Sequence, residues 1–98
     1  MMVKTGWNSD FGKEKFDVGL GEEDLARILA DRDIPPDVLL TPVEAFKALY
    51  FEAEYLSEMM KYSKLNDAQA RKNANEAKLS LDAHIGKIKA RTGLAGGE

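Results

Sequence analysis

The sequence predicts an all-α fold, with a short N-terminal helix followed by two long antiparallel helices, and two observations carry that prediction. First, apolar or small residues recur every three or four positions between residues 46 and 88, the spacing that places side chains on one face of a helix. These positions are Phe46, Leu49, Ala53, Leu56, Met60, Ala70, Ala74, Ala77, Leu81, His84 and Ile88. Second, a strong helix-start pattern begins at Thr41. Residues 22–92 are therefore expected to form one helical domain.

The short helix is expected from about Glu22 to Asp31. Three acidic residues open it, where the helix dipole favours negative charge. Its apolar face consists of Leu25, Ile28 and Leu29. Pro35 and Pro36 follow and prevent the helix from continuing, because neither can donate a backbone hydrogen bond.

The first long helix is expected to begin after Thr41. Thr41 is a favourable N-cap, Pro42 suits the first helical position, and Glu44 stands where its carboxylate can accept from the Thr41 amide. No glycine or proline occurs from there to Tyr62.

The spacing continues through a polar gap at Ser63 and Asp67, and this gap allows two interpretations. If Asn66 caps a second helix, with Gln69 at its third position, the chain turns there and the two helices form a hairpin. If it does not, residues 41–91 form one continuous coiled-coil helix in which the polar positions set the register. Three successive alanine layers disfavour a two-stranded coiled coil, so the hairpin is preferred.

The first long helix is apolar on two sides. One stripe contains Phe46, Leu49, Tyr50, Ala53, Leu56 and Met60 and is expected to face the second helix. The other contains Phe51, Tyr55, Met59 and Tyr62 and is expected to form a protein interface. Pairing of two hairpins into a bundle is the simplest closed arrangement, so a homodimer is expected, with a larger protein as a further possible partner.

Residues 1–21 contain four glycines among isolated aromatic residues and show neither a helical nor a strand period. They are expected to form an irregular arm that anchors through Trp7, Phe11 and Phe16, either on this chain's own core or on a partner. Residues 93–98 contain three glycines and are expected to form a flexible tail.

Charge is distributed unevenly along the chain, whose overall net charge is -3. Residues 1–60 hold six basic against thirteen acidic side chains, a net charge of −7, and residues 61–98 hold eight against four, a net charge of +4. The second half offers a possible anion or nucleic-acid contact at Lys61, Lys64, Arg71, Lys72 and Lys78. Nucleic-acid binding is therefore the alternative function, although the acidic first half opposes it.

The chain offers little material for catalysis. It has no cysteine and a single histidine, His84, at the edge of the apolar stripe, whereas a metal site needs three or four converging ligands. No apolar run approaches the length of a membrane span, and no signal-peptide core is present. The sequence thus predicts a cytoplasmic, non-enzymatic protein-binding module without cofactors, such as a small regulator, an adaptor or an assembly factor.

Overall fold

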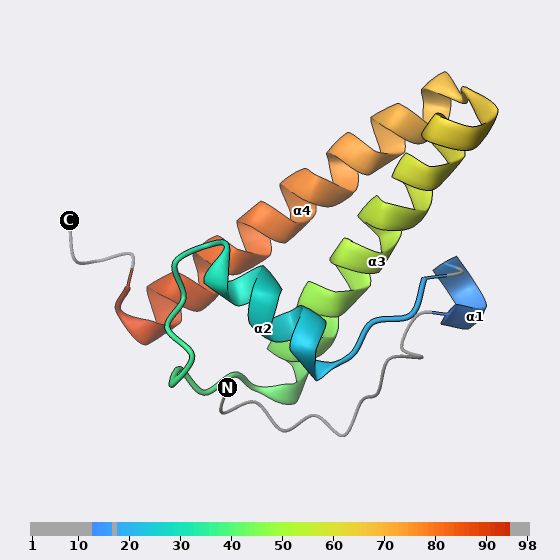
Figure 1. The fold of residues 1–98 in the computed structure, drawn as a ribbon. Coiled ribbons are helices and arrows are strands. Elements are labelled where there is room, and N and C mark those ends of the chain that lie inside the picture. Colours follow the sequence, from blue (N-terminus) through green and yellow to red (C-terminus); the bar gives the residue numbers. More distant parts are fainter. Residues whose placement is uncertain (1–12, 17, 95–98) are drawn as a thin grey trace.

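The computed structural model describes residues 13–16 and 18–94, and every regular element of appreciable length in these residues is a helix. The helices are α1 (Lys13–Phe16), α2 (Glu22–Ala30), α3 (Pro42–Leu65) and α4 (Ala68–Thr92) (Figure 1). The prediction of an all-α fold is confirmed. The short helix expected to end near Asp31 ends at Ala30.

The start of α3 is the one that the sequence predicts. The Thr41 hydroxyl oxygen accepts a hydrogen bond from the Glu44 amide at 3.1 Å, and the Thr41 amide donates to Glu44 Oε1 at 2.9 Å. Pro42 occupies the first turn, where its missing amide proton leaves no intrahelical bond unmade.

A two-residue break separates α3 from α4, so the alternative of one continuous helix is wrong. Asn66 adopts the left-handed conformation, with φ 55°, and ends α3. The N-cap of α4 is Asp67, one residue later than the expected Asn66, and its Oδ1 accepts from the amides of Gln69 at 3.0 Å and Ala70 at 3.3 Å. Asparagine tolerates the left-handed region better than most residues, which is why it ends the first helix instead of starting the second.

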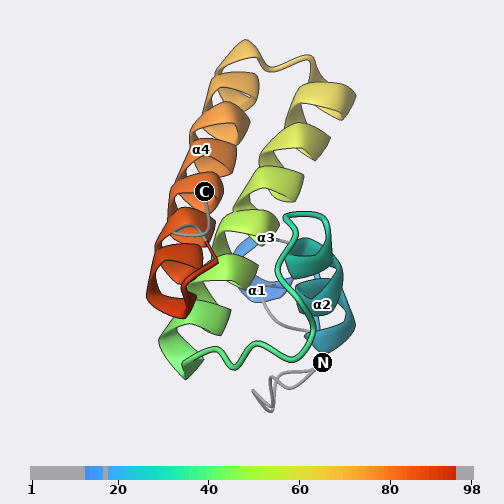
Figure 2. The same ribbon diagram turned by 90° about the vertical axis from the view of Figure 1, so that its left-hand side faces the viewer.

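The two long helices pack side by side and run in opposite directions (Figures 1 and 2). Contacts at both ends agree with this arrangement. Arg91 near the end of α4 reaches Glu44 in the first turn of α3, with Nη2 and Oε1 2.6 Å apart. Near the turn, Asn73 Nδ2 donates to Glu58 Oε2 at 3.4 Å.

The main core lies at the end of the α3–α4 pair that is remote from the turn, where α2 packs across α3 (Figure 2). Its largest fully buried side chains are Leu25, Ile28, Leu29, Leu49, Leu81 and Ile88. The apolar positions expected on α4 are all buried. Towards the turn the buried positions are small, with Ser57 on α3 and Ala70, Ala74 and Ala77 on α4.

The expected orientation of α3 is wrong in part. Leu49 and Ala53 of the first stripe are buried, but Phe46 is 44% exposed and Met60 38% exposed. Instead, Phe51 of the second stripe turns towards α4, where its ring meets the His84 ring at 6.2 Å. Because α2 also needs a face of α3, the helix is rotated so that Leu49 and Ala53 lie inside and both ends of the first stripe point outwards.

One turn of helix, α1, lies within the arm that showed no helical period. The side chains of α1 contact α3. The Phe16 ring meets the Tyr50 ring edge-on at 5.1 Å, and Lys15 Nζ donates to the Tyr50 hydroxyl at 2.8 Å. Phe16 thus packs against this chain's own core, whereas Trp7 and Phe11 lie outside the described residues. At the other end, Gly93 follows α4 with φ 83°, and residues 95–98 also lie outside the description.

Candidate binding surfaces

The predicted interface of Phe51, Tyr55, Met59 and Tyr62 is half-buried at all four positions. Phe51 packs against the core cluster and touches Tyr50 edge-on at 5.8 Å. The guanidinium carbon of Arg71 lies 5.6 Å from the centre of the Tyr62 ring, a cation–π contact between α4 and α3. Phe51 and Tyr62 therefore contact α4, which the sequence does not indicate. The role of the four side chains in a protein interface stays a prediction.

The most exposed large apolar side chains of α3 lie elsewhere, near its two ends. Val43 is 61% exposed at the beginning of the helix, and Leu65 is 73% exposed at its end. Val43, Phe46 and Met60 lie on one face of α3 and are exposed, whereas Tyr50 between them is half-buried. We call this face the outer stripe. Its spacing was visible in the sequence, but the direction in which it points was not.

An apolar groove adjoins the outer stripe where α1 meets the second half of α3. Its volume is about 220 Å³, and its lining consists of Phe16, Ser57, Met60, Lys61, Lys64 and Leu65. Lys61 forms an ion pair with Glu58 at 3.3 Å. The groove thus combines an apolar floor with a basic rim.

The structure brings four of the five predicted basic residues to one end of the molecule. Lys61 and Lys64 lie in the last turns of α3, and Arg71 and Lys72 in the first turns of α4. All four are exposed. Lys78 lies further along α4 and is not part of this basic group.

His84 has a structural position in this fold. Its side chain is buried, and Nε2 lies 2.8 Å from the carbonyl oxygen of Glu44. Because a carbonyl oxygen only accepts hydrogen bonds, Nε2 carries the proton. His84 therefore ties α4 to the first turn of α3, beside the contact between Arg91 and Glu44.

The Glu44 carboxylate accepts hydrogen bonds from both Thr41 and Arg91. Burial by itself would raise its pKa, but hydrogen bonds from Arg91 and from Thr41 together outweigh burial and lower the pKa. Arg91 binds it through two nitrogens, Nε and Nη2, each at 2.6 Å, and Nη2 also donates to the Leu39 carbonyl at 2.9 Å. A bidentate contact of this kind fixes orientation as well as charge.

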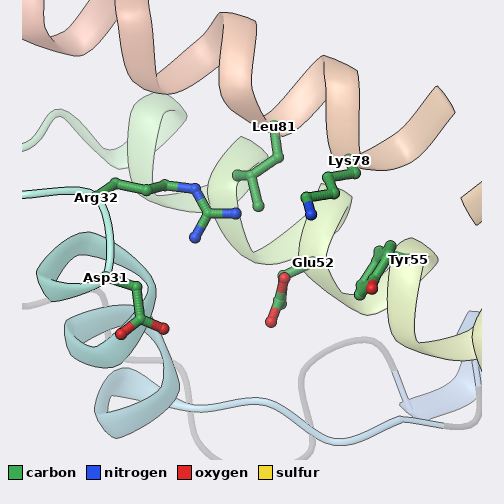
Figure 3. A pocket seen from close by; sticks show the side chains of 6 residues that line it. All are labelled: Asp31, Arg32, Glu52, Tyr55, Lys78 and Leu81. Carbon is green, nitrogen blue, oxygen red and sulfur yellow. The ribbon is translucent and has the colours of Figure 1, made fainter. Parts of the chain in front are cut away.

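A second cavity, which we call the polar cavity, lies between α2, α3 and α4 and has a volume of about 180 Å³ (Figure 3). Its lining consists of Asp31, Arg32, Glu52, Tyr55, Lys78 and Leu81. Glu52 is half-buried there, and burial raises the pKa of its carboxyl. Arg32 is supplied by the loop after α2, and no periodic pattern in the sequence points to its position.

Residues 13–16 and 18–94 have neither a metal-binding cluster nor a helix able to cross a membrane. These residues contain no group of three or more histidine, cysteine, aspartate or glutamate side chains close enough to hold a metal ion. Within the same ranges no helix combines the length and the apolar character that crossing a membrane requires.

The fold thus defines the class of the protein, an all-helical chain whose candidate surfaces lie on its two long helices and at their junction with α2. Comparisons with protein-family models, with curated proteins and with solved structures gave no match. The surfaces themselves are therefore the basis for proposing a function.

Proposed function

We propose that this protein is a non-enzymatic protein-binding module and that its first partner is a second copy of itself. The observation that carries the proposal is the apolar groove, together with the exposed side chains of Met60 and Leu65 at its edge. Exposed apolar side chains that gather around a groove are typical of protein interfaces, because covering them removes apolar surface from water.

Charge complementarity supports a second copy as the occupant. The rim of the groove carries Lys61 and Lys64, and the first sixty residues of any other copy have a net charge of −7. Opposite charges on the two surfaces favour their encounter and disfavour wrong orientations. The protein interface predicted from the sequence, which includes Trp7 and Phe11, remains part of this proposal. Substitutions at its residues would test it separately from the groove.

The oligomeric state tests the proposal directly. Light scattering coupled to size exclusion is expected to give a dimer mass at micromolar concentrations for the unmodified chain. The double variant Met60→Ser with Leu65→Ser is expected to elute as a monomer, because it removes the apolar edge of the groove. Leu79→Ser is the matched control, since Leu79 is 68% exposed on α4. A monomer mass for the unmodified chain at every concentration would overturn the proposal.

Nucleic-acid binding is the second candidate, because Lys61, Lys64, Arg71 and Lys72 are all exposed at the turn end. Binding through phosphates would depend steeply on salt. Fluorescence anisotropy with labelled single-stranded and duplex DNA at low salt tests it. A rise in anisotropy that added salt and the double variant Arg71→Ala with Lys72→Ala both abolish would support this function, and a flat titration would exclude it.

A further inference from the structure

The polar cavity is lined by charged groups that do not pair with one another. Arg32 and Lys78 supply two positive charges, and Asp31 and Glu52 supply two negative charges. Among the described residues no ion pair joins these cations to these carboxylates. Arg32 and Glu52 are half-buried, whereas Asp31 and Lys78 are exposed at the edge of the cavity. A half-buried charge carries a desolvation cost, and a ligand that pairs with Arg32 and Glu52 would offset it.

Arg32 has unused hydrogen-bonding capacity. Its Nε is buried without a hydrogen bond and lies 3.5 Å from Asp82 Oδ1, in an ion pair outside the cavity lining. Nη1 makes a long contact of 3.4 Å with the Ile28 carbonyl oxygen. A guanidinium has five N–H donors, so Arg32 can still bind a planar acceptor such as a carboxylate.

The two kinds of charge lie on different sides of the polar cavity. In Figure 3 the nitrogen-bearing ends of Arg32 and Lys78 lie towards α4, on either side of Leu81, and the carboxylates of Asp31 and Glu52 lie across from them. A simple anion would pair with the two cations but be repelled by the two carboxylates. A simple cation would pair with the carboxylates but be repelled by the two cations. A ligand that carries both charges at its two ends satisfies both sides.

We propose that the polar cavity binds a small zwitterion of the amino-acid type, with its carboxylate on Arg32 and Lys78 and its ammonium group on Asp31 and Glu52. The size agrees, since a cavity of about 180 Å³ is far larger than the roughly 10–15 Å³ that a single water molecule needs, and so has room for a molecule of several non-hydrogen atoms. Tyr55 and Leu81 supply the apolar wall for a small side chain. The polar cavity is separate from the apolar groove, so this site and the proposed self-association can fail independently.

Titration followed by amide chemical shifts tests the site in the full chain. Glycine and alanine are the probes, and acetate and methylammonium, each of which carries one half of the zwitterion, are the controls at matched ionic strength. Saturable shifts at Glu52, Lys78 and Leu81 are expected with the amino acids, and affinity about tenfold weaker or worse with either half alone. Absence of saturable shifts with glycine and alanine, or equal affinity for acetate, would overturn the proposal.

Variants identify the groups involved. Glu52→Gln and Lys78→Met are each expected to weaken glycine binding about tenfold, because each removes a charge from one end of the ligand. Lys72→Met is the matched control, an exposed lysine of α4 outside the polar cavity, and should leave affinity unchanged. Circular dichroism verifies folding, and if Glu52→Gln fails to fold, Lys78→Met decides the outcome. Unchanged affinity in a folded Lys78→Met variant would contradict the assignment.

Discussion

The two ends of the α3–α4 pair are built differently, although the same two helices form both. At the core end, large side chains such as Leu49, Leu81 and Ile88 are fully buried, in one cluster with the apolar side chains of α2. At the turn end, the buried positions are Ser57 and alanines, and Met60 and Leu65 are exposed. Small residues allow helices to approach closely but remove little apolar surface from water. The difference implies that stability resides at the core end and that the turn end provides accessible apolar surface.

The largest effect is expected from the core end. Leu49→Ala should lower the free energy of unfolding by about 2–5 kcal/mol, because it leaves a cavity where a fully buried side chain stood. Leu65→Ala at the turn end should change it by less than about 0.5 kcal/mol. Urea unfolding followed by circular dichroism measures both values, and similar losses in the two variants would contradict the comparison.

The two helix caps give a sharper test of the same contrast. Thr41→Ala removes the cap of α3 beside the core and should lower the global free energy of unfolding by about 1 kcal/mol. Asp67→Ala removes the cap of α4 at the turn and should mainly open the first turn of that helix. Hydrogen exchange separates the two cases, since the Asp67 variant should leave amides of the core end protected. Loss of that protection would show that the ends are not independent.

The protonation of Glu44 should make the stability of the core end depend on pH. Its pKa is lowered in the folded chain, so its stabilising contribution is complete above the ordinary pKa range of glutamate and is lost as pH falls through the lowered pKa. Glu44→Gln should therefore reduce stability at neutral pH by less than about 1 kcal/mol after allowance for solvent screening, and by less in acid. Thermal unfolding from neutral to acidic pH measures this, and a deficit that grows in acid would refute it.

Glu52 should change stability with pH in the opposite direction to Glu44, and its effect should be the smallest of those predicted. Burial raises its pKa, so the folded chain holds the proton more tightly, and stability falls as pH rises through the folded pKa. Glu52→Gln should raise the free energy of unfolding at neutral pH by about 0.3 kcal/mol, because the group is only half-buried, and should have no effect in acid. Glu76→Gln, at an exposed position of α4, is the control in the same thermal experiment.

Local features of the fold followed directly from the sequence. The cap at Thr41, the helical class of every long element and the burial of the α4 stripe were all predicted, because each depends on contacts within a few residues or on simple periodicity. The turn was predicted within one residue. Its exact cap differs because Asn66 and Asp67 are both suitable, and the left-handed conformation of Asn66 leaves the capping role to Asp67.

Of the candidate sites, the sequence indicated the residue types and the structure decided their positions. The basic residues near the turn were predicted as a possible group, and the apolar character of α3 was predicted on two sides. The polar cavity was not predicted, since Arg32, Glu52 and Lys78 are far apart in the sequence and come from a loop and two helices. No local pattern encodes such a meeting.

The sequence by itself determined where helices begin, end and are apolar, because caps, prolines and three-or-four spacing act over short distances. Only the tertiary structure decided which side of α3 faces inwards. Two apolar sides compete on that helix, and the choice depends on how α2 and α4 share its surface. This choice leaves Met60 and Leu65 exposed, covers part of the Phe51 stripe, and places Glu52 opposite Arg32 and Lys78.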